Sequence, residues 1–164
     1  DTRIQKLKNQ EYDAIILSLA GLARLNLEHL VTEVLDFKLF LPAAGQGAVG
    51  VQALKSSKVY NTFSSVNNIQ TQMECMSERR VLKNINANCN SPVSIYAKII
   101  KDKIILEFEI FDHQGNKIFK KSLADDKQKY LNLSDKLSEE IVTNLGQEKI
   151  DELDKLKNDF DYTP

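Results

Sequence analysis

The second half of the chain contains two runs of alternating apolar and polar residues, which predict β-strands over Pro92–Ile100 and Lys103–Phe111. Such alternation puts every second side chain on one face of the strand. The apolar residues that share these faces are Val93, Ile95, Ala97 and Ile99 in the first run, and Ile104, Leu106, Phe108 and Ile110 in the second. Residues 101–103 predict a hairpin turn, and a turn at 113–116 leads to a third strand at Lys117–Ser122. The pattern therefore predicts a three-stranded antiparallel sheet.

Apolar residues at helical spacing flank these strands on both sides. Residues 57–86 predict two helices separated at Asn67 and Asn68, with Asn67 as the N-cap of the second. Residues Tyr130–Leu145 predict a further helix, because every fourth position is apolar. We expect the charged residues 147–164 to extend that helix before it frays. Helix, helix, three strands and helix together make a small α+β domain.

The beginning of the chain follows a different pattern. A short helix is predicted at Thr2–Asn9, then a nearly continuous apolar run at Tyr12–Leu19, then a second short helix at Ala20–Leu25. A continuous apolar run is typical of a strand buried on both faces of a parallel sheet. Helix, buried strand and helix in succession indicate an α/β layer, but the unit is too small to be a domain. We therefore expect the chain to be a piece of a longer protein.

The segment between these two parts is rich in glycine. Its helix-disfavouring residues are Pro42, Gly45, Gly47 and Gly50, and a short strand is predicted at Ala48–Leu54. The glycines match the GxGxxG pattern of dinucleotide-binding sites. That motif needs a strand immediately before it, a helix immediately after it, and an acidic residue roughly 20 positions further on. Pro42 interrupts the approach, and Gln70 and Thr71 occupy the acidic region. We therefore interpret the segment as a crossover between domains rather than a nucleotide site.

Composition narrows the class of protein. Hydrophobic residues make up 42% and charged residues 27% of the 164 residues, which is typical of a folded globular protein. A formal net charge of -1 with scattered lysines argues against binding to nucleic acid or to an anionic membrane. The two cysteines, Cys75 and Cys89, form no CxxC pair and have no histidine at metal-ligand spacing, so we expect no metal site. No apolar run is long enough to cross a bilayer, and we expect a cytoplasmic protein.

Three sequence segments carry a resemblance to a known family. They are DAIILSLAGLARLNL at residues 13–27, LPAAGQGAVGVQ at 41–52 and SERRVLKNINANCNSPVSIYA at 77–97. In this order and at these separations they resemble the C-terminal half of porphobilinogen deaminase (hydroxymethylbilane synthase). The resemblance extends from Thr2 to about Leu145.

The resemblance implies a division of the chain into three parts. Residues 1–40 would be the C-terminal part of the family's second domain, an α/β domain like those of periplasmic binding proteins. Residues 41–56 would be a crossover strand that belongs to the first domain. Residues 57–164 would be the third domain, with a three-stranded antiparallel sheet covered by helices and a cysteine on a loop that faces the active-site cleft.

Cys89 corresponds to the family's cofactor cysteine, which the resemblance implies is attached to a dipyrromethane. A thiolate is a good nucleophile at neutral pH, and its attack on an electrophilic pyrrole methylene forms a stable thioether. From the residues alone, a buried structural cysteine is the favoured interpretation of Cys89, and the resemblance reverses that preference. Cys75, in the middle of a predicted helix, is interpreted as a packing residue.

Arg3 and Arg24 resemble the family's substrate-binding arginines. Each pyrrole of the growing chain carries acetate and propionate groups, and the planar guanidinium can bind a carboxylate through two hydrogen bonds. The alternative for each is a solvated surface arginine. Glu78 and Arg79 also follow the family pattern, and we interpret them as an internal ion pair or a domain contact.

The family's activity is the condensation of four porphobilinogen molecules into hydroxymethylbilane with release of ammonia. The resemblance implies that the catalytic aspartate belongs to N-terminal domains absent from this chain, so no catalytic residue is assigned here and the chain alone is expected to be inactive. Expected partners are those domains, porphobilinogen and the growing polypyrrole, with a monomeric parent. The loop departs from the family because Asn88 and Ser94 replace glycines. A non-catalytic interaction module that keeps the fold is therefore the alternative.

Overall fold

The computed structural model describes residues 2–88 and 91–155, the last two by their backbone only. The chain divides into two compact units, Asp1–Asp36 and Phe37–Pro164. In the described part of the chain, all β-strands belong to the second unit. The first unit contains the helices α1 (Thr2–Lys8) and α2 (Leu19–Arg24) and the 3₁₀ turn η1 (Glu28–Leu30).

The sheet of the second unit has three antiparallel strands in the order β1-β2-β3. These strands are β1 (Val93–Ile100), β2 (Lys103–Phe111) and β3 (Lys117–Asp126). The hairpin between β1 and β2 turns at Lys101, whose φ of 58° is in the left-handed region. The sheet and its register confirm the alternation seen in the sequence. Only the end of β3 was wrong: it continues past Ser122 because Lys103–Leu106 of β2 still pair with it.

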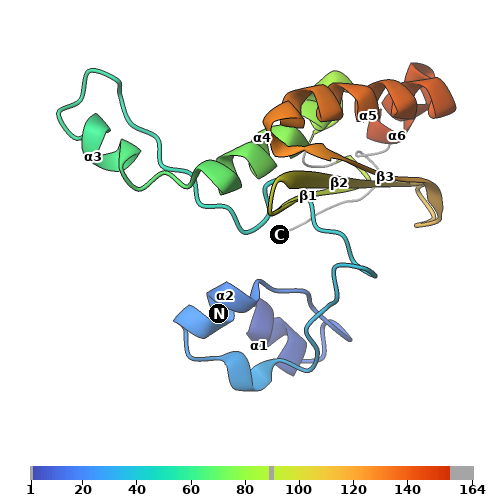
Figure 1. Cartoon of the computed structure of the whole chain (residues 1–164). Coiled ribbons are helices and arrows are strands. Elements are labelled where there is room, and N and C mark those ends of the chain that lie inside the picture. The colour runs from blue at the N-terminus through green and yellow to red at the C-terminus, as the bar shows by residue number, and fades with distance from the viewer. Residues whose placement is uncertain (1, 89–90, 156–164) are drawn as a thin grey trace. The chain divides into compact units, whose positions relative to one another are not determined.

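Two long helices, α4 (Ile69–Asn84) and α5 (Tyr130–Leu145), cover one face of this sheet (Figure 1). The apolar strand faces named above point into the layer between sheet and helices, and Ile95, Ile104, Leu106 and Phe108 are completely buried there. Leu137 and Ile141 of α5 and Val81 and Ile85 of α4 complete the core. Burial of a continuous apolar face on both elements is what stabilises this two-layer arrangement.

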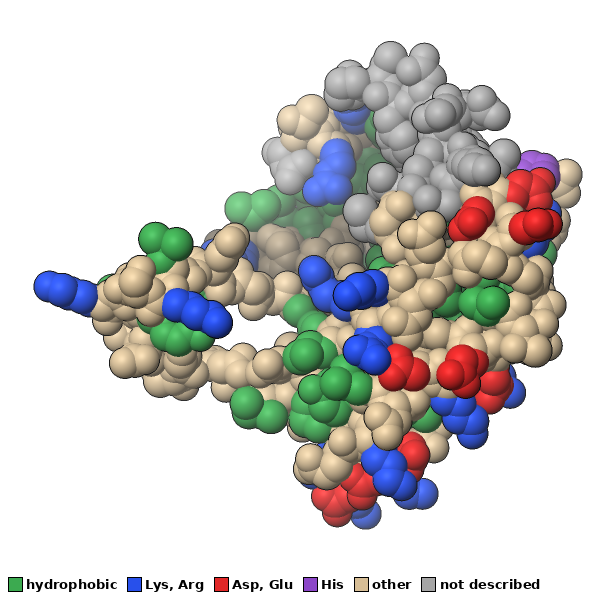
Figure 2. Space-filling view, turned by 90° about the horizontal axis from the view of Figure 1, so that it is seen from above, with side chains coloured by type: hydrophobic (Ala, Val, Ile, Leu, Met, Phe, Trp, Pro, Cys, Tyr) green, Lys and Arg blue, Asp and Glu red, His purple; other side chains and the backbone are tan. Residues whose placement is uncertain are grey.

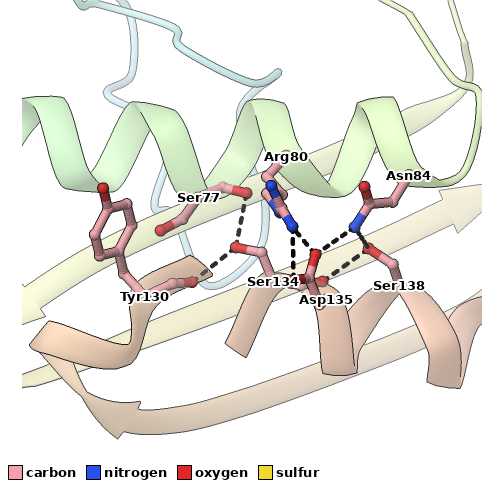
Figure 3. Close-up of polar contacts among 7 residues, drawn as sticks. All are labelled: Ser77, Arg80, Asn84, Tyr130, Ser134, Asp135 and Ser138. Carbon is pink, nitrogen blue, oxygen red and sulfur yellow. Dashed lines mark hydrogen bonds and ion pairs between the residues drawn. The ribbon is translucent and has the colours of Figure 1, made fainter. Parts of the chain in front are cut away.

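A row of polar contacts holds α4 and α5 side by side (Figure 3). The Arg80 guanidinium donates two hydrogen bonds to the Asp135 carboxylate, at 2.7 and 2.8 Å. The Asn84 amide donates to the same carboxylate at 2.7 Å. Deeper in the interface, the buried Ser134 hydroxyl of α5 lies 3.0 Å from the Ser77 carbonyl oxygen of α4 and 2.9 Å from the Tyr130 carbonyl oxygen of its own helix. These contacts fix the rotation of α4, and therefore the direction in which its other side chains point.

Several helix boundaries differ from the sequence prediction. The first helix of the 57–86 region is the short α3 (Tyr60–Ser64), and Asn68 rather than Asn67 caps α4 by accepting from the Thr71 N–H at 3.0 Å. Residues 156–164 of the charged C-terminal region lie outside the described residues, and its described part, residues 147–155, does not extend α5. It forms a separate helix, α6 (Gln147–Lys155), because Gly146 has a φ of 78° that ends α5.

The predicted strand at Ala48–Leu54 is wrong in this structure. These residues have no regular secondary structure, and Val49, Val51 and Leu54 are 91%, 60% and 77% exposed. A strand exists only where a neighbouring backbone pairs with it, and none does in the described part of the chain. Figure 2 shows hydrophobic side chains at the surface of the second unit, consistent with this exposure.

The predicted buried strand at Tyr12–Leu19 is wrong for the same reason. Residues 12–18 of the first unit form neither helix nor strand, and Ile16 is 68% exposed. An apolar run indicates that its residues tend to be buried, whereas a strand also requires a neighbouring strand with which to form backbone hydrogen bonds. The two predicted short helices on either side are confirmed as α1 and α2.

Candidate functional site

Cys89 lies outside the described residues, so the candidate site is built from the two ends of its loop. The loop begins where α4 ends. Ile85 is buried in the core, Asn86 takes a left-handed φ of 57°, and the Ala87 N–H donates to the Leu82 carbonyl at 2.9 Å. Asparagine is one of the few residues that adopts this conformation readily, so the chain turns off the helix at low cost.

The far end of the loop is equally well anchored. The Asn88 N–H donates to the Ser91 hydroxyl at 2.8 Å, and the Ser91 N–H donates to the Asn88 carbonyl at 3.1 Å. The Pro92 carbonyl accepts from the Phe111 N–H at 2.9 Å, which joins the loop end to β2. The residues on both sides of Cys89 are thus tied to each other and to the sheet.

The Gly-rich segment turns beside the sheet that follows this loop. Gly45 and Gly47 have φ values of 70° and 82°, in the region that glycine adopts without strain. The Gln46 N–H donates to Ala43 and the Ala48 N–H to Gly45, which closes two consecutive turns. The glycines therefore form a compact turn, and the helix that a dinucleotide site needs is absent from the described residues of this segment.

Three acceptors cover the outer edge of β1. The Pro42 carbonyl accepts from the Ile95 N–H at 3.0 Å, the Glu78 carboxylate from the Ala97 N–H at 2.8 Å, and the Glu74 carboxylate from the Ile99 N–H at 2.7 Å. Alternate N–H groups of an edge strand point away from the sheet and need partners. One backbone carbonyl and two side chains of α4 supply those partners here.

Glu78 makes a second contact that reaches the Gly-rich turn. Its other carboxylate oxygen accepts from the Gly45 N–H at 2.6 Å, and the residue is only 5% exposed. Burial raises the pKa of the Glu78 carboxyl, although the two N–H donors, from Ala97 and Gly45, act in the opposite direction. Of the two interpretations of Glu78 and Arg79, the internal ion pair was wrong, because the hydrogen-bond partners of Glu78 are the backbone amides of Gly45 and Ala97, and the domain contact stays a prediction.

The two candidate arginines belong to the first unit. Arg3 lies near the start of α1 and Arg24 is the last residue of α2, and both side chains are exposed. The N-terminus of α2 is capped by Ser18, whose hydroxyl accepts from the Gly21 N–H at 3.4 Å. Arg24 therefore sits at the end of a short, capped helix directly after the exposed apolar run.

The remaining thiol and the histidines show no catalytic arrangement in the described structure. Cys75 is partly buried on α4, and burial raises the pKa of its thiol. His29 in η1 and His113 in the turn before β3 are exposed. The described residues contain no cluster of three or more His, Cys, Asp or Glu that could bind a metal ion. In the same residues, no helix is both long and apolar enough to span a bilayer.

Two family models match the chain, in two consecutive segments. The dipyromethane cofactor binding domain of porphobilinogen deaminase matches residues 1–62. The C-terminal domain of porphobilinogen deaminase matches residues 72–143, which include the sheet, most of α4 and α5, and the Cys89 loop. The chain belongs to the porphobilinogen deaminase family. The family assignment made from the three sequence segments is thereby confirmed.

Curated relatives agree with the family models. The chain is 36% identical over 143 residues to the porphobilinogen deaminase of Clostridium kluyveri, an alignment that covers 87% of this chain and 49% of that protein. It is 37% identical over 141 residues to the enzyme of Clostridium botulinum strain Langeland, with 86% and 48% covered. The enzyme of Clostridium beijerinckii is 36% identical over the same length. The chain therefore spans about half the length of the curated relatives it matches.

The bridging role of Glu78 could not be predicted from the sequence. A sequence signal does exist, since Glu74 and Glu78 are one helical turn apart and so lie on the same face of α4. Acidic residues at this spacing usually indicate a solvated helix face. Only the position of α4 against the edge of β1 shows that these two carboxylates accept from backbone amides instead.

Proposed function

We propose that this chain supplies the C-terminal half of a hydroxymethylbilane synthase, which condenses four porphobilinogen molecules and releases ammonia. The observation that carries the proposal is the match of nearly the whole chain to one half of porphobilinogen deaminases from several clostridia. The described residues on both sides of Cys89 are anchored by hydrogen bonds, and Asn86 and Asn88 are exposed, which is compatible with a reacting group that substrate must reach.

Cys89 is the proposed attachment point of a dipyrromethane. The donor chemistry fits, since a thiol is the side chain that forms a stable thioether with a pyrrole methylene. Asn86 and Asn88, on the N-terminal side of Cys89, are exposed. When bound, the dipyrromethane would supply the pyrrole to which the first substrate is joined. The family model named for this cofactor matches residues 1–62, so the first unit is proposed to contribute to its binding as well.

Arg3 and Arg24 are proposed to bind the acetate and propionate groups of the pyrroles. Both guanidinium groups are on exposed helix positions, and each can donate two parallel hydrogen bonds to a carboxylate. Charged hydrogen bonds of this kind contribute roughly 1.5–3 kcal/mol each. Two or more such contacts would retain a polyanionic chain during successive condensations.

The proposed partner of this chain is the N-terminal half of the same enzyme. We propose that residues 1–40 complete a second domain of the periplasmic-binding-protein type, and that residues 41–56 add a strand to the first domain. The exposure of Ile16, Val49 and Leu54 supports this, because apolar runs that predict strands otherwise face solvent. The catalytic aspartate is proposed to lie in that N-terminal half, and the assembled enzyme to be a cytoplasmic monomer that binds neither nucleic acid nor membrane.

The test is to produce the chain together with the N-terminal half of the Clostridium kluyveri enzyme and to measure hydroxymethylbilane formation and the intact mass. We expect activity in the mixture, none in either half alone, and a dipyrromethane-sized mass increase that maps to Cys89. The Cys89→Ser variant should lose both the mass increase and the activity, while Cys75→Ser should keep both. An assembled complex with neither adduct nor product would overturn the proposal.

The alternative is a non-catalytic interaction module that retains the fold. The replacement of two family glycines by Asn88 and Ser94 in the cysteine loop favours it. The same experiment separates the two functions. A stable complex with the N-terminal half that binds porphobilinogen but never acquires an adduct at Cys89 is the result expected of such a module.

A further inference from the structure

The Gly45 and Ala97 N–H groups are both buried or partly buried donors that point at the same carboxylate. Gly45 belongs to the Gly-rich turn and Ala97 to the middle of β1, so the two lie in different segments of the second unit. Two N–H groups cannot hydrogen-bond to each other. A carboxylate, with one acceptor oxygen for each, is the side-chain group that satisfies both at once.

The Gly-rich segment contacts β1 directly through Phe37 and Pro42, and through the Glu78 carboxylate at Gly45. The Phe37 ring stacks on the Tyr96 ring with centroids 5.0 Å apart, and the Pro42 carbonyl accepts from the Ile95 N–H. After that single backbone hydrogen bond the segment turns away at Gly45. Glu78 accepts from the Gly45 N–H and from the Ala97 N–H, which is the next outward N–H of β1 after Ile95. The side chain therefore joins the turn to the strand.

These contacts lie next to the cysteine loop. Strand β1 begins at Val93, directly after Pro92, and Ile95 and Ala97, which bind the Pro42 carbonyl and Glu78, are its third and fifth residues. On the other side, α4 carries Glu78 and continues into Ile85 and Asn86, where the loop starts. Both ends of the loop are therefore attached to elements that Glu78 connects to the Gly-rich turn.

We propose that Glu78 is a positioning residue that couples the Gly-rich turn at residues 42–47 to α4 and β1, the two elements that border the cysteine loop. One oxygen of its carboxylate accepts from Gly45 in the turn and the other from Ala97 in β1, the strand that begins directly after the loop. The purpose of this coupling, to keep Cys89 aligned with the Gly-rich crossover, rests on the proposed function. The coupling itself does not depend on it.

Four other charged or titratable side chains interact electrostatically with Glu78. Glu74 is one turn earlier on the same helix and raises the pKa of Glu78, whereas Arg79 lowers it. Cys75 on α4 and Tyr96 on β1 both respond to the charge of Glu78. None of these four side chains accepts from the Gly45 or Ala97 N–H, so the chemical shifts of those two amide protons report the Glu78 carboxylate.

The test is an NMR titration of the amide protons in the full 164-residue chain. The Gly45 and Ala97 amide protons should shift together with one shared midpoint, above the ordinary glutamate value of about 4.3. In Glu78→Gln both titrations should disappear. The matched control is Glu74→Gln, which alters the Ile99 amide on the same strand edge and should leave the Gly45 titration in place. Separate midpoints for Gly45 and Ala97, or a Gly45 titration that persists in Glu78→Gln, would overturn the proposal.

Coupling to the loop is measured by thiol reactivity in a Cys75→Ser background, where Cys89 is the remaining cysteine. Glu78→Gln should change the iodoacetamide alkylation rate of Cys89 by about twofold or more, because local opening of the bridge frees the loop, and Glu74→Gln should not. Equal rates in all three proteins would refute the coupling. Neither measurement requires enzyme activity, so failure of the coupling leaves the proposed function standing, and absence of hydroxymethylbilane leaves the coupling standing.

Discussion

Replacing Glu78 by glutamine is expected to destabilise the second unit by more than its small change in size suggests. The glutamate accepts two hydrogen bonds, from Gly45 at 2.6 Å and from Ala97 at 2.8 Å. Glutamine has one acceptor oxygen, and its amide nitrogen is a donor, so one N–H would face another N–H. Loss of a hydrogen bond to a charged group costs about 1.5–3 kcal/mol, and relief from burying a charge offsets part of this. We expect a net loss of about 1–2 kcal/mol at pH 7.

Urea denaturation followed by far-UV circular dichroism measures this loss. Glu74→Gln is the matched control, because a single oxygen of Glu74 accepts from the Ile99 N–H and glutamine retains such an oxygen. We expect that variant to stay within about 0.5 kcal/mol of the unmodified chain. Equal losses in the two variants would show that the second acceptor of Glu78 contributes nothing, and the reasoning from donor and acceptor counts would be wrong.

Three further predictions concern the packing and electrostatics of the chain. Leu137→Ala should cost about 2–5 kcal/mol in urea denaturation, because this α5 side chain is completely buried, and a loss below about 1 kcal/mol would contradict the packing described. Gly45→Ala should cost about 1–2 kcal/mol because its φ is 70°, while Gly50→Ala, with open space around it, should be nearly neutral. The hydrogen bonds from Arg80 lower the pKa of Asp135, so its stabilising contribution is present above the unfolded value of about 3.9 and is lost as the pH falls through the lowered pKa. In Asp135→Asn, the urea midpoint should therefore lose the part of its decrease at low pH that comes from protonation of Asp135. A dependence of the urea midpoint on pH identical to that of the unmodified chain would contradict this prediction.

Local sequence patterns predicted the sheet and its main helix because the hydrogen-bonding and packing partners of those elements lie within the chain. The alternating residues of β1 and β2 pair with each other across a short hairpin, and the apolar residues of α5 cover the face they create. Every neighbour that such a pattern requires is close in the sequence. Period and turn residues were therefore enough to predict the element and its direction.

The same reasoning failed at Tyr12–Leu19 and Ala48–Leu54, where the pattern is apolar but no neighbouring strand is described. Hydrophobic periodicity measures a preference for burial, and it does not specify what provides the burial. Val49 at 91% exposure is as apolar as Ile95 at 0%, and the two differ only in the presence of a partner. If the proposed N-terminal half pairs with these runs, both will be strands in the assembled enzyme.

Sequence resemblance and structure contribute different parts of the candidate site. The resemblance alone identifies Cys89, Arg3 and Arg24, since an exposed arginine and a loop cysteine have no distinctive local pattern. The structure alone identifies the Glu78 bridge, because its two partners come from segments that only the fold brings together. The rows of contacts between α4 and α5 orient α4 so that Glu78 reaches both partners. Variants at Arg80 or Asp135 should therefore affect the Gly45 amide, even though these two residues do not contact it.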